Sequence, residues 1–265
     1  MNQIKAVVLD WAGTTVDFGC FAPLDVFKRI FADKGIELTL EEVRLPMGMA
    51  KKDHIRAILL FPRITALWQE RFGIAWTETD VEAMYADFEP LMMETLAGHT
   101  EVLEGVIDTC GWLRRNRIKI GSTTGYTGKM METVCREAGK KGYMPDAVVT
   151  ADMVGGCGRP APDMMFKNME LLGVYPPSAI VKVGDTVADI EEGLNAGAVS
   201  VGVVVGSSVM GMTKEEYGAL DEKEKIEACR RAAAVFCTAG ADHVILSLKE
   251  LPALIEMINS KRRKA

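Results

Sequence analysis

Acidic, hydroxyl and cationic residues follow several short apolar runs of this sequence, at the points where each run gives way to a turn. The residues concerned are Asp10, Thr123, Thr124, Arg159, Asp185 and Asp189. A carboxylate can attack phosphorus, a carboxylate pair can hold a hard divalent ion, and hydroxyls and cations bind anionic oxygens. The set therefore predicts a site for a phosphoryl group, where magnesium and Arg159 would neutralise the charge that repels a nucleophilic carboxylate.

Strand-like and helical runs alternate over most of the chain, a pattern typical of a parallel sheet covered on both faces. We expect strands at residues 6–10, 119–122, 147–150, 180–183, 199–204 and 243–245, and helices at residues 105–116, 129–140, 162–172, 189–196 and 248–261. Ligands of open α/β sheets bind outside the carboxyl ends of the strands, and the polar residues named above fall there or in the loops that follow.

Residues 21–99 differ from the rest of the chain because their pattern is helical almost throughout. Apolar positions recur with helical spacing at 26–31, 55–61 and 81–96, and no strand is predicted between them. A chain of 265 residues is also longer than a typical single core. We therefore expect a core domain from residues 1–20 and 100–265, with residues 21–99 inserted as a helical cap domain.

The bulk properties exclude several classes of protein. A hydrophobic content of 48% and a charged content of 26% are ordinary for a globular protein, and no apolar run reaches the roughly 18 residues of a membrane span. The amino terminus lacks the pattern of a secretory signal. A net charge of −6 argues against nucleic acid as a partner. The six scattered cysteines form no metal-like spacing and favour reduced thiols in the cytoplasm.

The strand-end residues resemble, in order and separation, the sequence motifs of the haloacid dehalogenase superfamily. The first motif is Val-Val-Leu-Asp10-Trp-Ala-Gly-Thr-Thr, and the last is Gly184-Asp185-Thr186-x-x-Asp189. A single Asp after a strand is more often a turn or cap residue, so the resemblance depends on the ordered set. It implies an α/β fold with a Rossmann-like parallel sheet core and an inserted all-helical cap, Asp10 as nucleophile, and Mg²⁺ as cofactor.

Ala12 departs from the pattern of this superfamily in an informative way. Phosphatases and mutases of the group have a second Asp at this position, which protonates the leaving oxygen. Dehalogenases also lack that Asp, but they need no metal, whereas Asp185 and Asp189 are retained here. A carbon leaving group on phosphorus satisfies both observations, because it needs no proton from that acid.

Lys51 is the candidate for stabilising such a leaving group. An imine between a lysine and an adjacent aldehyde turns the departing carbanion into an enamine. A helix that begins near Ala50 places Lys51 on one face with His54, Ile55 and Ile58, whereas Lys52 lies on another face. Loss of water on the apolar face would lower the pKa of Lys51 and leave a free amine. The alternative is that both lysines are solvated surface charges.

Two further segments, Asp10 to Pro23 and Gly121-Ser-Thr-Thr-Gly-Tyr126, together with residues 46–55, are similar to those of the phosphonatases, a family that hydrolyses phosphonoacetaldehyde. This resemblance implies Asp10 as nucleophile, Lys51 as the Schiff-base lysine, and a small phosphonate as substrate. The implied metal ligands are Asp10, the carbonyl of Ala12 and Asp185, with Asp189 binding directly or through water. Phosphoryl contacts are implied for Arg159 and Thr124, although the end of the strand leaves Thr123 open. Other matches to the family's site are Cys20, Met47, Gly48, His54 and Tyr126.

Less specific roles compete for several of these residues. Met47 is typical of core packing, Cys20 of a buried small apolar residue, and His54 of a hydrogen-bonded surface histidine on a helix. The rival functions are a magnesium-dependent phosphatase or mutase, with His54 supplying the acid, and a non-catalytic binding scaffold. The phosphonatase resemblance also implies a homodimer through the cap, where the run Ile58-Leu-Leu-Phe61 offers apolar surface.

Overall fold

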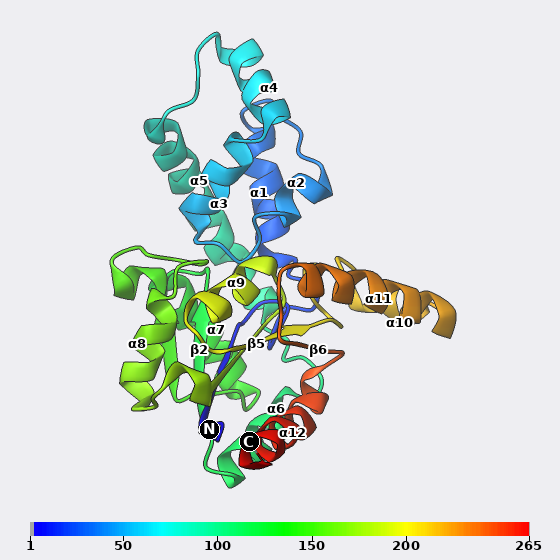
Figure 1. Cartoon of the computed structure of the whole chain (residues 1–265). Helices are drawn as coiled ribbons and strands as arrows, with labels where there is room; N and C mark the ends of the chain where they lie inside the picture. The colour runs from blue at the N-terminus through cyan, green and yellow to red at the C-terminus, as the bar shows by residue number, and fades with distance from the viewer. Residues whose placement is uncertain (1–2, 265) are drawn as a thin grey trace.

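The computed structural model describes residues 3–264, and these form a six-stranded parallel sheet surrounded by helices, with further helices grouped at one end (Figure 1). The strands are β1 Ala6–Leu9, β2 Lys119–Thr124, β3 Ala147–Thr150, β4 Ile180–Gly184, β5 Val199–Val203 and β6 His243–Ile245, and their order across the sheet is β3-β2-β1-β4-β5-β6. The predicted α/β fold class is confirmed.

β1 lies in the middle of the sheet and is buried on both faces, which explains its uninterrupted apolar sequence. Ala6 and Val8 belong to a buried cluster that includes residues of α8 (Asp163–Leu172). Val7 and Leu9 belong to a second cluster that includes residues of α6 (Val106–Arg115), α7 (Gly128–Lys140) and α12 (Leu251–Lys264). Asp10 therefore directly follows a strand that is held firmly on both faces.

The register of the neighbouring strands brings their polar ends to the same edge of the sheet. Leu9 pairs with Ser122 of β2 on one side and with Val183 of β4 on the other. β2 was expected to end at residue 122, but it continues through Thr124, because its last residues pair with β3. Both candidate threonines therefore belong to the strand itself.

The helices after β5 were not among those expected. They are α10 Lys214–Ala219 and α11 Glu222–Thr238, and they follow α9 Val187–Asn195 along the chain. Each begins with a capping box, Thr213 with Glu216 and Asp221 with Glu224, so the sequence did carry their start signals. Among the described residues, no helix combines the length and the apolar character that crossing a membrane requires.

Residues 21–99 contain helices and no strand, and these helices lie together at the top of Figure 1. They are α1 Ala22–Ala32, α2 Leu40–Arg44, α3 Lys51–Leu59, α4 Pro62–Phe72 and α5 Glu78–Leu96. The rings of Phe27 on α1 and Phe88 on α5 pack 4.6 Å apart between centroids inside this group. On this basis we propose the limits 21–99 for the cap and 1–20 with 100–265 for the core, of which Met1, Asn2 and Ala265 lie outside the described residues.

The cap joins the core through two linkers that are tied to each other. The amide of Leu103 donates to the carbonyl of Thr15 at 2.9 Å, and the amide of Asp17 donates to the carbonyl of Glu101 at 3.1 Å. The carboxylate of Asp17 also accepts from the amide of Ala22 at 2.9 Å and lies 3.1 Å from Nδ1 of His99. Asp17 therefore fixes the start of α1 and holds both linkers at one point.

Candidate active site

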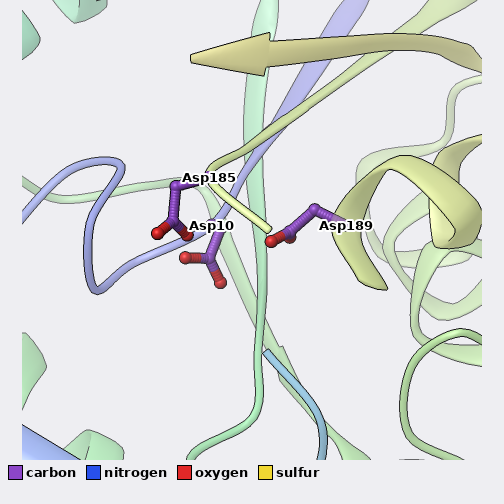
Figure 2. A group of neighbouring side chains, drawn as sticks. All are labelled: Asp10, Asp185 and Asp189. Carbon is purple, nitrogen blue, oxygen red and sulfur yellow. The ribbon is translucent and has the colours of Figure 1, made fainter. Parts of the chain in front are cut away.

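Three carboxylates meet at the carboxyl edge of the sheet. Asp10 follows β1, Asp185 follows β4, and Asp189 lies in the first turn of α9 (Figure 2). Each offers an oxygen, and these oxygens lie within 4.8 Å of one another. All three residues are buried, so their mutual repulsion is poorly screened by water.

Burial and the crowding of the carboxylates raise the pKa values of Asp10 and Asp185. Burial, and then the charge of Asp189, raise the pKa of Asp10. Burial and the charge of Asp10 raise the pKa of Asp185 well above its ordinary value. Asp185 accepts from the amide of Ser208 at 2.7 Å through Oδ2, while its buried Oδ1 has no hydrogen-bond partner among the described residues. An oxygen-binding cation at this point would satisfy Oδ1 and reduce the repulsion, so the residues fit a hard divalent ion.

Asp189 is in a different position, because cations of the protein already surround it. Its Oδ1 lies 2.7 Å from Nζ of Lys182 and 3.0 Å from Nη1 of Arg159, and its Oδ2 accepts from the hydroxyl of Thr186 at 2.6 Å. Burial alone would raise the pKa of Asp189, but Arg159 and Lys182 outweigh burial and lower it. Asp189 is therefore held by the protein to a greater extent than Asp185.

Arg159 connects the nucleophile candidate to the rest of the edge. Its Nη2 lies 2.7 Å from Oδ1 of Asp10, and its Nε lies 3.0 Å from Oε2 of Glu192. Burial alone would lower the pKa of Arg159, but Asp189, Asp10 and Glu192 raise it above its ordinary value. The guanidinium is therefore a permanent cation beside Asp10, placed to bind anionic oxygens.

Lys51 reaches the same place from the cap. It begins α3, as expected, and the predicted inner face of that helix, comprising Lys51, His54, Ile55 and Ile58, is buried. The side chain of Lys51 is 4% exposed, and its Nζ lies 4.9 Å from the ring centroid of Tyr126 and 5.8 Å from that of Phe27. Burial lowers the pKa of Lys51, which favours the uncharged amine.

A small cavity of about 20 Å³ lies between the cap and the core at this point. That volume holds a water molecule rather than a substrate, so the structure represents a closed arrangement. Most of the expected site residues line it, together with Gly125 and Thr186, which were not expected. The expected residues in the lining are Asp10, Ala12, Cys20, Met47, Gly48, Lys51, Thr124, Tyr126, Arg159 and Asp185.

Thr123 and His54 do not line this cavity. The hydroxyl of Thr123 points into the buried charge network, where it donates to Glu192 at 2.9 Å. Nε2 of His54 donates to the carbonyl of Val43 at 2.8 Å, and its ring stacks on Phe27 with centroids 3.9 Å apart. Burial, and then the charge of Lys51, hold the pKa of His54 well below its ordinary value, so the ring is neutral at pH 7.

Cys20, Met47 and Tyr126 lie in the cavity wall and are themselves buried. Burial is the main cause that raises the pKa of the Cys20 thiol and of the Tyr126 phenol well above their ordinary values. Both side chains are therefore protonated at neutral pH and contribute shape and polarity rather than charge.

Lys182 and Glu192 are charged residues next to the cavity that the sequence analysis also missed. Both are fully buried and both touch Asp189 or Arg159 through ion pairs. The available signal was a lysine within the apolar run Ile-Val-Lys-Val-Gly of β4, since a charge in a central strand must find a buried partner.

Arg44, the last residue of α2, holds the cap to the core on the Asp185 side. Its Nη1 donates to the carbonyls of Gly19 at 3.2 Å and Ser208 at 2.9 Å, and its Nη2 donates to that of Gly211 at 3.2 Å. Because the amide of Ser208 also holds Asp185, closure of the cap and placement of this carboxylate share one loop.

Glycines allow the two parts of the molecule to approach closely elsewhere along their boundary. A Cβ at Gly125 would lie 2.3 Å from the carbonyl oxygen of Met49, and a Cβ at Gly48 would lie 2.4 Å from the hydroxyl of Thr186. Gly48 also has φ +91°, which other residues rarely adopt. The carbonyl of Gly48 accepts from Arg159 at 3.4 Å across the boundary.

Comparison with known proteins gives consistent matches over most of the chain. Residues 4–197 match the family model "haloacid dehalogenase-like hydrolase". The chain is 49% identical to phosphonoacetaldehyde hydrolase of Lysinibacillus sphaericus, over 98% of this chain and 96% of the relative. It is 49% identical to the bifunctional phosphonoacetaldehyde hydrolase/aminoethylphosphonate transaminase of Clostridioides difficile, over 100% of this chain and 41% of that longer protein.

The crystal structure of a phosphonoacetaldehyde hydrolase-like protein from Oleispira antarctica is similar in three dimensions. It superposes with a TM-score of 0.95 at 36% identity, covering 98% of this chain and 94% of that protein. The similarity therefore includes the helical group above the sheet as well as the sheet itself.

Proposed function

The chain belongs to the haloacid dehalogenase-like hydrolases and, within them, to the phosphonoacetaldehyde hydrolases, and we propose that it acts through an imine on Lys51 and a phosphorylated Asp10. The reaction is hydrolysis of the carbon–phosphorus bond of phosphonoacetaldehyde to acetaldehyde and phosphate. The similarity to phosphonoacetaldehyde hydrolases supports the overall reaction. The buried amine of Lys51, which lines one cavity with Asp10, supports the two covalent steps.

Magnesium is the cofactor in this proposal, held by Asp10, the carbonyl of Ala12 and Asp185. The unsatisfied Oδ1 of Asp185 and the crowding of the carboxylates support this assignment. Asp189 acts behind these ligands, because its own oxygens are engaged by Lys182, Arg159 and Thr186. When bound, the metal neutralises negative charge on the phosphonyl oxygens and on the attacking carboxylate.

The first covalent step takes place on Lys51. The neutral amine attacks the aldehyde carbon of the substrate, and uptake of one proton with loss of water gives a protonated imine. The lowered pKa of Lys51 leaves the electron pair of Nζ free for this attack. The phosphonyl group of the bound substrate then lies toward Asp10 and Arg159, which line the same cavity as Lys51.

The second covalent step takes place on Asp10. A carboxylate oxygen of Asp10 forms a bond to phosphorus while the carbon–phosphorus bond breaks. The electron pair of the broken bond moves onto the protonated imine, which becomes a neutral enamine on Lys51. Protonation of the enamine carbon and hydrolysis of the resulting imine release acetaldehyde and restore the amine. A second water attacks the aspartyl-phosphate to release phosphate. Arg159 and Thr124 orient the phosphonyl oxygens in both transfers.

The observation that carries this proposal is a buried lysine with a lowered pKa that shares a cavity with Asp10, in a chain with Ala12 where an acid would stand. Sodium borohydride reduces imines, so protein mixed with phosphonoacetaldehyde and borohydride should acquire a two-carbon adduct on Lys51, located by peptide mass mapping. Formation of acetaldehyde and phosphate without any lysine adduct would contradict the imine.

Within residues 3–264, no feature favours the rival phosphatase or mutase. That reading needs an acid near the leaving group, and His54 was its candidate. The ring of His54 lies outside the cavity lining, and its donor Nε2 is committed to Val43. A binding scaffold without activity would not need the buried, strained arrangement of charges around Asp10.

We also propose a homodimer through the cap, on the family resemblance. Ile58 and Leu59 are buried within the chain and offer no surface, whereas Leu60 is 62% exposed and Leu45 is 69% exposed. Sedimentation velocity of the purified protein would give the mass in solution, and Leu60→Glu should shift it toward the monomer if the cap is the interface.

A cytoplasmic location completes the proposal. All six cysteines are free in the structure, and Cys20 lies in the cavity wall as a thiol. A reducing compartment maintains thiols in this form. Fractionation of cells that produce the protein, with a periplasmic enzyme as reference, tests this location.

A further inference from the structure

A buried ion pair behind the cavity has no part in the steps above. Lys182 on β4 and Glu192 on α9 are both 0% exposed, and Nζ of Lys182 lies 3.0 Å from Oε2 of Glu192. Gly193 leaves room for the stem of Lys182, because a Cβ there would lie 3.1 Å from Cβ and Cγ of the lysine. Neither residue lines the cavity, so any effect on the reaction must pass through other groups.

Glu192 binds the guanidinium of Arg159 at its base. Its Oε2 receives Nε of Arg159 at 3.0 Å and the hydroxyl of Thr123 at 2.9 Å, in addition to Lys182. Nε is the base of the guanidinium fork, so fixing it determines where the two terminal nitrogens point. With Nε held, Nη2 lies 2.7 Å from Asp10 and Nη1 lies 3.4 Å from the carbonyl of Gly48.

Lys182 supplies the charge that this arrangement needs. Asp10, Asp189 and Glu192 are three carboxylates around Arg159, which alone cannot neutralise them. Nζ of Lys182 lies 2.7 Å from Asp189 and also donates to the hydroxyl of Thr123 at 2.8 Å. Because Lys182 shares Asp189 and Glu192 with Arg159, the guanidinium keeps Nη2 for Asp10.

A buried ion pair is seldom the most stable solution for a protein core, since apolar residues of similar volume often stabilise it as well or better. A fully buried pair one contact away from the nucleophile is therefore better explained by control of that site than by stability.

We propose that Glu192 and Lys182 are positioning residues that hold the guanidinium of Arg159 in the orientation required for phosphoryl transfer to Asp10. The inference rests on the proposed function, because it assigns these residues to the second covalent step and not to imine formation. Removing the pair should slow cleavage of the carbon–phosphorus bond while leaving the imine on Lys51 intact.

Glu192→Gln keeps the shape and an acceptor oxygen but removes the charge, and Glu191→Gln, on the exposed neighbouring residue, is its matched control. We expect Glu192→Gln to lower kcat by about 10-fold to 100-fold, the usual effect of losing a group that orients a reacting one, with borohydride trapping at Lys51 unchanged. The Nε–H resonance of Arg159 in a ¹H–¹⁵N spectrum should shift or lose its protection from exchange. Glu191→Gln should match the wild type in all three measurements.

Lys182→Met combined with Glu192→Gln separates positioning from stability, because both buried charges are removed together. We expect this double variant to unfold at a temperature near that of the wild type and still to cleave slowly. Wild-type kcat in both variants would overturn the inference, as would parallel loss of cleavage and of trapping. Failure of the wild type to form an adduct would instead overturn the imine mechanism itself.

Discussion

Lys51 in the cap and Arg159 in the core are both buried basic side chains that line one cavity, yet their pKa values shift in opposite directions, although burial alone lowers both. Arg159 has three carboxylates within 3.0 Å, and they raise its pKa. Lys51 has aromatic rings beside it and no ion pair among the described residues, and its pKa falls. The neighbours of a buried basic side chain therefore decide whether it is an uncharged nucleophile or a permanent cation.

The largest expected effect comes from removing the nucleophilic member of this comparison. Lys51→Arg keeps a long basic side chain but cannot form the imine, so we expect acetaldehyde formation to fall by about 10³-fold or more, as when a covalent catalyst is lost. Lys52→Arg is the matched control, because Lys52 is half-exposed and pairs with Glu82 on the surface. Substantial cleavage by Lys51→Arg would remove the distinction between the two cations.

The next effect tests the carboxylates on the core side. Asp185→Asn should lower activity by about 10²-fold through weaker metal binding. The substitution also removes one of three crowded negative charges, so the metal-free variant should unfold at a higher temperature than metal-free wild type. Adding Mg²⁺ should raise the unfolding temperature of the wild type and have little effect on Asp185→Asn. An equal Mg²⁺ response in both proteins would place the ion elsewhere.

Arg44→Met tests whether closure of the cap on the core depends on the hydrogen bonds of Arg44. The variant loses donors to three carbonyls, so the cap should close less often, and we expect KM to rise about 10-fold with a smaller change in kcat. Arg63→Met is the control, since Arg63 belongs to the same cap but pairs with Glu42 on the surface. Unchanged KM in Arg44→Met would show that packing alone holds the cap.

The smallest effect concerns the linkers that join cap and core. The hydrogen bond with Asp17 raises the pKa of His99 above its unfolded value. The stability that protonated His99 contributes is therefore fully present below that unfolded value and is lost as the pH rises through the folded one. His99→Gln should lower the unfolding temperature by about 2 °C at pH near 5.5 and by less than about 1 °C at pH 8.5. In an Asp17→Asn background this pH dependence should disappear, and its persistence would exclude the linker contact as the cause.

The sequence predicted the parts of the site that depend on local order. Asp10 and Asp185 directly follow strands, and the helical period of 3.6 residues placed Lys51 on a buried face while leaving Lys52 outside. These statements need only the distance along one element. The order and spacing of the motifs predicted that residues at several strand ends share one site, and the register of β1 with β2 and β4 brings three of these strand ends to one edge of the sheet.

Contacts between distant segments could not be predicted in the same way. Lys182 finds Glu192 and Thr123 only because β4, α9 and β2 are packed at one register, which no local pattern specifies. The helical period placed His54 on the buried face correctly, but it could not tell the cavity wall from the interior of the cap. α11 was missed although its capping box is present, because its buried residues, Ala228, Ala232 and Phe236, form a narrow stripe.

The glycines at the boundary between cap and core leave no room for larger side chains at their positions. A methyl group at position 125 would clash with backbone atoms rather than with a movable side chain. It would therefore keep the cap from closing on the core. Such a substitution would delete no reactive group, and we expect the cap and the core each to fold. Solvent would then separate the amine of Lys51 from the carboxylate of Asp10. We therefore expect a single added carbon atom at this position to abolish the reaction.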